Sequence, residues 1–395
     1  MAPSVLKLPF SNSTVRVRLI DTTAVLTVRA ESFIEPAQKG QETMNMTCAA
    51  FLIEHEPSGK KIMFDLGVRK DYWNLAAMIQ ERLGKVIPSL RVDRDTSEIL
   101  VEKGISLESI SSVIWSHYHW DHTGNMSLFP SSTELVVGPG FKDSPALLPG
   151  FPEHPDSPVC SSDFRGRQLR EIDFKSNLRI DGFAAYDFFG DGSFYLLDTP
   201  GHCLGHMCGL ARTTAGDDST FLLLGGDICH FVGDLRPNPT YLMPDHIPAE
   251  VLDADPAYFP SPCPCTLFTD HHPLLPHGAD LDEKKKTPFF RVSAHEKSAY
   301  VDPPIAQESV DKLLAFESSP QVLVCLAHDK TLHKHLPTLN EDPELTLNDW
   351  QERGWKEKCR WDWLNELPRN GKPGRKPVVE GFWRDGKPWD RSKVE

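Results

Sequence analysis

One nine-residue segment constrains this chain more than any other. Residues 116–124 read Ser-His-Tyr-His-Trp-Asp-His-Thr-Gly and directly follow a short apolar run. Imidazole nitrogen and carboxylate oxygen are ligands that suit Zn²⁺, Fe²⁺ or Mn²⁺. His117 and His119 can reach one ion together, whereas Asp121 and His122 fit a second ion close by. The spacing therefore predicts a metal centre that holds two divalent ions.

The segment resembles the H-x-H-x-D-H motif of the metallo-β-lactamase superfamily, whose members build a binuclear site at the edge of an αββα sandwich. Three later segments resemble the remaining ligand positions of that superfamily: Thr199-Pro200-Gly201-His202, Gly225-Gly226-Asp227 and Ala327-His328-Asp329. Each is weak alone, because such residues often form an ordinary turn after a strand. Together, and in this order, they make a strong resemblance.

The resemblance implies a role for each ligand. His117, His119 and His202 would bind the first ion, Asp121, His122 and His328 the second, and Asp227 would bridge both. The cofactors are then two divalent metal ions. We expect Zn²⁺, although manganese, iron and cobalt accept similar ligands.

The order of apolar segments predicts the fold. We expect two β-rich halves with outer helices, an α/β (α+β) chain folded as a four-layer αββα sandwich. Strands are predicted near residues 15–20, 24–28, 49–53, 62–67, 112–115, 134–137, 182–186, 194–197, 220–224 and 322–326, and helices over 72–83, 96–103 and 306–316.

Three segments are not needed to build this sandwich. We place the catalytic domain at residues 1–330, with long insertions at about 138–177 and 231–305 that we expect to select the substrate. Residues 331–395 hold six of the nine tryptophans, namely Trp350, Trp355, Trp361, Trp363, Trp383 and Trp389. Large aromatic side chains mostly serve burial, so we predict a C-terminal extension packed on the body.

Composition and charge argue against some classes of binding partner. A net charge of −14 argues against nucleic acid, because phosphate binding relies on basic surface. No signal peptide or membrane-spanning run is apparent, so we expect a cytoplasmic protein with a small-molecule substrate and no membrane partner. The nine scattered cysteines do not form a disulfide framework, and we assign no metal to Cys203, Cys208 or Cys229. Both a monomer and a homodimer remain open.

Within the superfamily, the chain is most similar to lactonases that open N-acyl homoserine lactones and to fungal relatives that open lactones or cyclic amides. This resemblance implies a hydrolase in which a metal-bridging hydroxide opens a lactone, a γ-lactam or a cyclic carbamate such as a benzoxazolinone. Asp121 would then move a proton to the leaving group.

One position departs from the lactonase pattern. Those lactonases carry a tyrosine three residues beyond the bridging aspartate, where this chain has His230. An imidazole can hydrogen-bond a substrate and can protonate a nitrogen leaving group, so His230 is a catalytic candidate beside Asp121. A merely packed histidine fits the sequence equally well. Tyr72, Trp73 and Phe231 are candidates for an apolar wall of the pocket.

Two other classes of function stay open. One is a thioesterase of the glyoxalase II or polyketide-releasing kind, although the C-terminal segment offers no clear basic site for glutathione. The other is a metal-binding protein without catalysis. Persulfide dioxygenases of the superfamily use a single iron, which would leave Asp121 and His122 with little to do.

Overall fold

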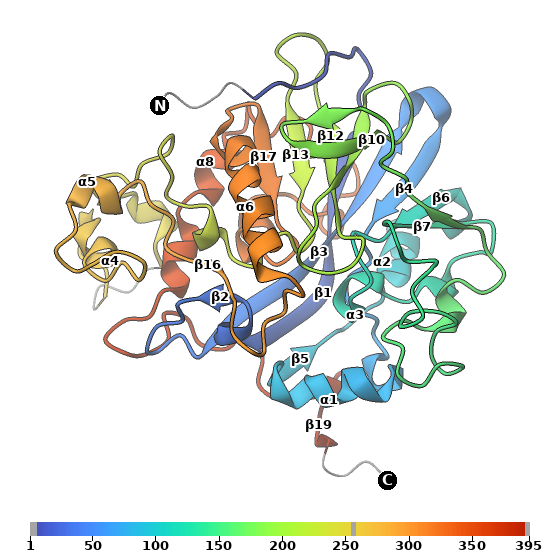
Figure 1. The fold of residues 1–395 in the computed structure, drawn as a ribbon, viewed down its shortest axis with the longest axis horizontal. Helices are drawn as coiled ribbons and strands as arrows, with labels where there is room; N and C mark the ends of the chain where they lie inside the picture. Colours follow the sequence, from blue (N-terminus) through green and yellow to red (C-terminus); the bar gives the residue numbers. More distant parts are fainter. Residues whose placement is uncertain (1–5, 254–257, 392–395) are drawn as a thin grey trace.

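Two β-sheets packed face to face form the centre of the computed structural model, which describes residues 6–253 and 258–391 (Figure 1). In order across the larger sheet, the strands are β19 (Lys387–Trp389), β18 (Phe382–Arg384), β5 (Ser89–Arg91), β1 (Arg16–Arg29), β3 (Thr43–His55), β4 (Lys60–Phe64), β6 (Ile110–Ile114), β7 (Glu134–Val137) and β8 (Leu169–Glu171). Across the second sheet they are β17 (Val322–Cys325), β13 (Phe221–Leu224), β12 (Met207–Arg212), β11 (Phe194–Asp198), β10 (Phe183–Asp187) and β9 (Arg179–Ile180).

Helices and two small ribbons complete the described part of the chain. The helices are α1 (Ala77–Lys85), α2 (Thr96–Glu102), α3 (Trp120–Thr123), α4 (Thr266–Thr269), α5 (Leu281–Lys284), α6 (Pro303–Ser318), α7 (Lys330–His335) and α8 (Trp355–Cys359). Strand β14 (His246–Ile247) pairs with β15 (Cys263–Pro264), and β16 (Arg291–Val292) pairs with β2 (Ile34–Glu35). None of these helices combines the length and apolarity that crossing a bilayer requires.

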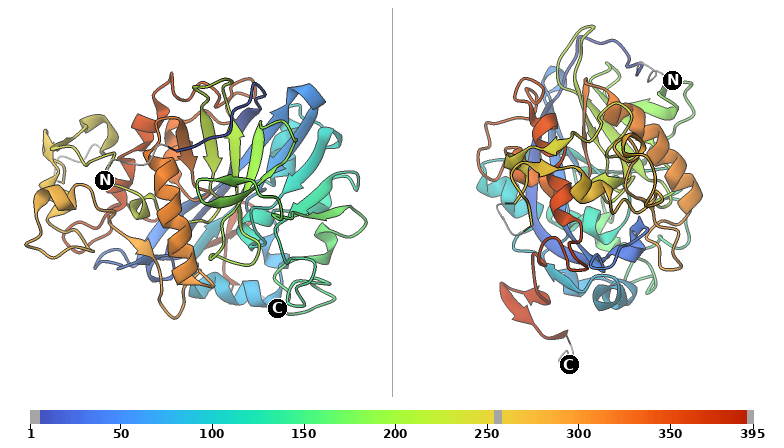
Figure 2. Two further views of the ribbon diagram at one scale, coloured as in Figure 1. Left: turned by 45° about the horizontal axis from the view of Figure 1, so that its top comes forward. Right: turned by 90° about the vertical axis from the view of Figure 1, so that its left-hand side faces the viewer.

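Successive side chains of a strand point to opposite faces of its sheet, so each sheet packs against the other sheet on one face and against helices on the other. Val17 and Leu19 of β1 face the second sheet and pack with residues such as Leu222 and Leu224 of β13. The opposite face of the larger sheet packs against α2, and the opposite face of the second sheet packs against α6, as the views in Figure 2 show. These layers confirm the predicted αββα architecture.

Tertiary packing corrects the predicted helix over 72–83. The structure has a 3₁₀ turn at Tyr72–Asn74 and then α1, which loses helical geometry at Leu83 and Gly84. The Tyr72 hydroxyl is held by the backbone carbonyl of Trp383 in the C-terminal segment. This distant contact overrides the local helical pattern. By contrast, α2 forms as predicted, with a capping box between Asp95 and Glu98.

Two strand predictions also need correction. The strands predicted near residues 15–20 and 24–28 are parts of one long strand, β1, which begins at Arg16 and whose pairing with β3 shifts register between Asp21 and Val25. Strand β12 is absent from the prediction. All six of its residues are buried, among them Arg212, whose guanidinium donates to the carbonyls of Pro9 and Gly192. A strand covered on both faces lacks the alternation that reveals strands in a sequence.

The long segments beyond the sandwich have structure of their own. Residues 138–177 include β8 at the edge of the larger sheet, and residues 231–305 include α4, α5 and three short strands. In the C-terminal segment, Trp350, Trp355, Trp361 and Trp363 are buried, while strands β18 and β19 extend the larger sheet beside β5.

Candidate metal centre

Strand ends bring the candidate ligands together. Strands β4 and β6 are parallel, as are β13 and β17, so the loops that follow them meet at one edge of the sandwich. The loop after β6 carries the histidine motif, and those after β11, β13 and β17 carry His202, Asp227 and His328. Gly201 has a φ of +121°, and a Cβ there would lie 2.2 Å from the backbone nitrogen of Ala306 in α6. Glycine thus lets the His202 loop pass directly over that helix.

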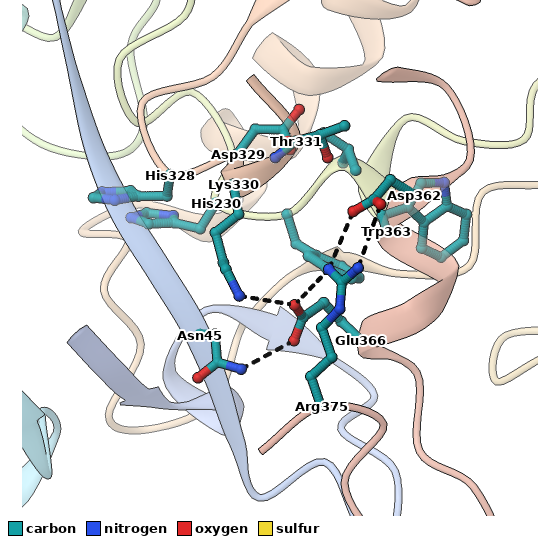
Figure 3. Close-up of a pocket in the computed structure, with 12 residues that line it drawn as sticks. Asn45, His230, His328, Asp329, Lys330, Thr331, Asp362, Trp363, Glu366 and Arg375 are labelled. Carbon is teal, nitrogen blue, oxygen red and sulfur yellow. Dashed lines mark hydrogen bonds and ion pairs between the residues drawn. The ribbon is translucent and has the colours of Figure 1, made fainter. Parts of the chain in front are cut away.

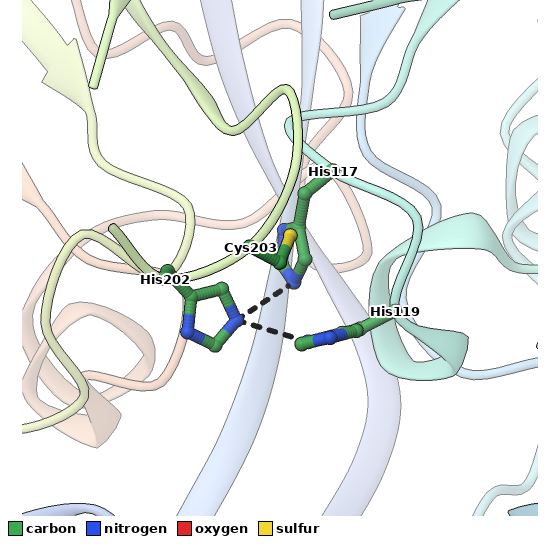
Figure 4. Close-up of side chains that lie close together, drawn as sticks. All are labelled: His117, His119, His202 and Cys203. Carbon is green, nitrogen blue, oxygen red and sulfur yellow. Dashed lines mark hydrogen bonds between the residues drawn. The ribbon is translucent and has the colours of Figure 1, made fainter. Parts of the chain in front are cut away.

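Three imidazoles form the first group of donors (Figure 4). His202 Nε2 lies 3.2 Å from His117 Nε2 and 2.9 Å from His119 Nδ1. A neutral imidazole has one ring proton, so these nitrogens cannot all be satisfied by one another, and their lone pairs face a common centre. The Cys203 thiol also lies within 4.8 Å of the three nitrogens, and burial raises its pKa well above the usual value.

The second group contains Asp121, His122 and His328, with Asp227 between the two groups. Asp227 Oδ1 lies 3.1 Å from His122 Nε2 and 3.0 Å from His328 Nε2. Its other oxygen, Oδ2, lies 3.4 Å from His202 Nε2 and 3.6 Å from His117 Nε2. One carboxylate thus presents one oxygen to each group of ligands.

Unsatisfied buried atoms show that this arrangement suits cations. Although His122 Nε2 and His328 Nε2 lie close to Asp227 Oδ1, these three buried atoms form no well-directed hydrogen bond with one another or with any other residue in the described part of the chain. Buried polar atoms are rarely left without a partner. A divalent ion bound by imidazole and carboxylate would satisfy all three, so the residues present fit the predicted ions.

Hydrogen bonds behind the ligands orient their rings. His122 Nδ1 lies 2.8 Å from Asp65 Oδ2, and His328 Nδ1 lies 2.7 Å from the carbonyl oxygen of Thr47. Asp227 donates its backbone N–H to His206 Nε2, at 2.9 Å, so His206 carries its proton on Nδ1, beside Thr199. Such partners determine which nitrogen faces a metal.

Asp65 is a functional residue that was not predicted from the sequence. Asp65 lies inside the strand predicted near residues 62–67, yet both of its carboxylate oxygens bind Ser116 or His122 of the motif loop. The only available signal was an acidic residue directly after an apolar strand.

The histidines of the two ligand groups have pKa values shifted in opposite directions. Burial lowers the pKa of His117 and His202 well below the usual value and, together with the nearby charge of Arg82, lowers that of His119 to about 3. Burial also opposes protonation of His122 and His328, but the adjacent Asp227 carboxylate raises the pKa of both. A cation at the second group would take the place of that proton.

His230 points into the same centre. Its Nε2 lies 3.0 Å from Asp227 Oδ2, and its Nδ1 lies 2.8 Å from the hydroxyl of Tyr300. Burial lowers the pKa of His230, so the ring is neutral, donating from Nε2 and accepting at Nδ1. Tyr300 was not foreseen, because it is 70 residues away in the chain.

A pocket of about 290 Å³ opens beside these residues. His119, Asp121, His202, Asp227 and His230 line one side of it. The rest of the lining is largely apolar. It comes from both long insertions, from α1 and the turn after it, and from the residue before β2, and includes Phe33, Met78, Ile79, Val86, Leu147 and Pro158.

The aromatic residues predicted to form a wall of the pocket do not line it. Tyr72 is fully buried and packs with Trp73 and Trp389, away from the pocket. Phe231 instead borders a separate cavity of about 20 Å³ behind His230 and His328, where its ring meets Trp363 (Figure 3). The chain direction after Asp227 could not be known without the fold.

Comparisons with known proteins agree with this site. Residues 45–212 match the model of the metallo-β-lactamase superfamily. The γ-lactamase FDB1 of Fusarium pseudograminearum is 41% identical over 376 residues, which cover 92% of this chain and 85% of that protein. The metallo-hydrolase mfmC of Annulohypoxylon moriforme is 38% identical over 373 residues, covering 92% of this chain and 90% of that protein.

Solved structures show the same fold. A single-residue mutant of AiiA from B. thuringiensis, with N-decanoyl-L-homoserine bound at its active site, superposes with a TM-score of 0.53. The two share 16% identity, and the match covers 84% of this chain and 99% of that one. The chain belongs to the metallo-β-lactamase superfamily and is a metal-dependent hydrolase.

Proposed function

We propose that this enzyme opens a small cyclic ester or cyclic amide: a lactone, a γ-lactam or a cyclic carbamate such as a benzoxazolinone. The carrying observation is the position of Asp227, which presents Oδ1 to one ligand group and Oδ2 to the other at the edge of the pocket. The similarity to a protein named γ-lactamase supports the cyclic amide. A volume of about 290 Å³, at the lower end of the usual range for ligand pockets, supports a small substrate.

In this proposal the chain's residues hold two ions. His117, His119 and His202 would hold the first, Asp121, His122 and His328 would hold the second, and Asp227 lies between the two groups. When bound, two divalent ions supply an activated water molecule and polarise the carbonyl under attack. Zn²⁺ suits this set of imidazole and carboxylate ligands.

Proton transfer falls to the groups that face the pocket. Asp121 lines the pocket, and its carboxylate has no hydrogen-bond partner in the described part of the chain, so it can accept a proton from water and pass it on. His230 carries its N–H on Nε2, beside Asp227 Oδ2, and in this proposal the N–H donates instead to a substrate carbonyl or leaving atom that enters there. Tyr300 keeps that tautomer in place by donating to Nδ1.

Metal analysis combined with a substrate panel tests the proposal. We expect about two divalent ions per chain, and hydrolysis of γ-lactones, γ-lactams or cyclic carbamates that a chelator abolishes. His117→Ala and Asp227→Ala should lose both metal and turnover. Hydrolysis of thioesters alone, one iron per chain with oxygen uptake, or no turnover in the metal-loaded protein would each overturn it.

A further inference from the structure

Among the described residues, an unpaired cation lies in the wall of the pocket beside the candidate metal centre. Arg82 lines the pocket together with His119 and Tyr118, and it is only partly exposed. Its guanidinium forms no ion pair or hydrogen bond with any residue in the described part of the chain, whereas its charge acts on both neighbours. A guanidinium has five N–H donors, so a partly buried one usually has a partner.

The backbone around Arg82 holds it in this position. Helix α1 breaks at Leu83 and Gly84, and the chain turns so that both Val86 and Ile87 donate to the Arg82 carbonyl. Arg391 of the C-terminal segment donates to the carbonyls of Gln80 and Leu83. The turn is therefore fastened on both sides, which orders the arginine before a ligand arrives.

A groove next to the pocket is also basic, in a chain whose net charge is −14. A groove of about 970 Å³ lies on the other side of the α1 turn and shares Val86 with the pocket. Arg29, Lys39, Lys85 and Lys297 line it, against the acidic Glu31 and Glu42. Such a local excess of positive charge attracts anions toward the site.

The acidic groups of the pocket do not cancel Arg82. Asp121 and Asp227 lie at the metal end, where two cations would balance them. Asp156 lies on an exposed loop at the pocket wall and forms no ion pair with Arg82. The apolar wall residues between these charges suit the hydrocarbon part of a substrate.

We propose that the natural substrate is a member of these ring classes that also carries a carboxylate, so that an unsubstituted benzoxazolinone would be a poorer substrate, and that Arg82 binds this carboxylate. This inference rests on the proposed function, and Arg82 acts in it as a specificity-determining residue. The reacting carbonyl lies at Asp227 and His230, the hydrocarbon body against Phe33 and Met78, and the carboxylate at the guanidinium, where two parallel hydrogen bonds can form.

A matched pair of substrates tests the assignment. One γ-lactone carries an alkyl arm that ends in a carboxylate, and the other carries the same arm as its methyl ester. We expect a higher kcat/KM for the acid. Arg82→Gln should lower kcat/KM for the acid about tenfold or more and change the ester less than about twofold, since a hydrogen-bonded charge is lost only for the acid. Arg82→Lys should restore part of the loss.

Lys103→Gln is the control, because it removes the same charge from a residue that lines none of these cavities. It should leave the preference for the acid unchanged. Equal effects of Arg82→Gln on acid and ester, or equal effects of Lys103→Gln, would overturn the role of Arg82 while leaving the hydrolase intact. Failure of both lactones, and of the lactam and carbamate panel, would instead count against the proposed function.

Discussion

At the scale of single residues, the groups that hydrogen-bond to each site residue from behind determine the orientation of its ring. Asp65 and the Thr47 carbonyl orient the rings of His122 and His328, and Tyr300 orients His230. The lactonase tyrosine expected near this position is replaced by His230, yet a tyrosine hydroxyl still reaches the centre from the second insertion. The two side chains act as one hydrogen-bonded unit.

Removing the Tyr300 hydroxyl tests this unit. In Tyr300→Phe, Nδ1 of His230 loses its donor, and we expect kcat to fall about tenfold with metal content unchanged, as for other residues behind a ligand shell. The pH profile of kcat should shift, because the His230 tautomer is no longer held. Tyr195→Phe, in β11 outside the pocket, is the control. Unchanged kcat and pH profile in both variants would remove Tyr300 from the mechanism.

Asp163 has a consequence for stability rather than catalysis. Burial raises its pKa to about 7, against the opposing charges of Arg69 and Arg167. Because this pKa lies above the unfolded value, the contribution to stability is complete below about pH 4 and is lost as pH rises through about 7. Asp163→Asn removes that dependence.

Its measurement is the free energy of unfolding at fixed metal concentration. As pH rises from about 4 to about 8, the free energy of unfolding of Asp163→Asn should increase relative to that of the natural protein by on the order of 4 kcal/mol. Equal differences at both ends of this range would show that Asp163 is ionised in the folded protein.

At the scale of elements, the C-terminal hairpin β18–β19 supports the pocket without lining it. Arg391, just beyond the hairpin, holds carbonyls at the end of α1, and Met78, Ile79 and Arg82 of that helix line the pocket. A helix end that loses these bonds has unsatisfied carbonyls and frays.

Arg391→Ala should therefore raise KM several-fold, with little change in metal content, because α1 no longer holds its side chains at the pocket. Lys387→Ala, on the exposed part of the same hairpin, should not change KM. An unchanged KM in Arg391→Ala, together with an unchanged KM after deletion of the hairpin, would contradict this role.

At the scale of the whole molecule, a buried ion pair joins distant segments. Arg236 lies near the start of the second insertion and Glu317 near the end of α6, and their side chains are 2% and 1% exposed. Arg236 also donates to the carbonyl of Cys359, and Lys356 of α8 donates to the carbonyl of Glu317. The insertion, the sandwich and the C-terminal segment thus meet at one buried network.

Glu317→Gln leaves Arg236 as an uncompensated buried charge. We expect it to lower the free energy of unfolding by about 3 kcal/mol or more. Urea denaturation at fixed metal concentration measures this loss. Glu308→Gln, on the exposed face of the same helix, should cost less than about 0.5 kcal/mol. Similar values for the two variants would show that the pair is not needed to hold these segments together.

Much of the fold was predictable because its signals are local. Alternating apolar residues marked most central strands, and the candidate ligands directly follow them in the chain, so their meeting at one edge followed from parallel strands. Strand β12 escaped because burial on both faces removes the alternation. The helix over 72–83 failed because Trp383, far along the chain, holds Tyr72.

The sequence by itself determined the αββα fold, the superfamily and the set of ligand-type residues, since each depends on residue type and short spacing. The tertiary structure alone decided which groups surround that set: Asp65 behind His122, Tyr300 behind His230, and Arg82 in the pocket wall. These neighbours come from segments whose mutual approach depends on packing across the whole molecule. For that physical reason, the nature of the substrate is determined by the fold around the motif.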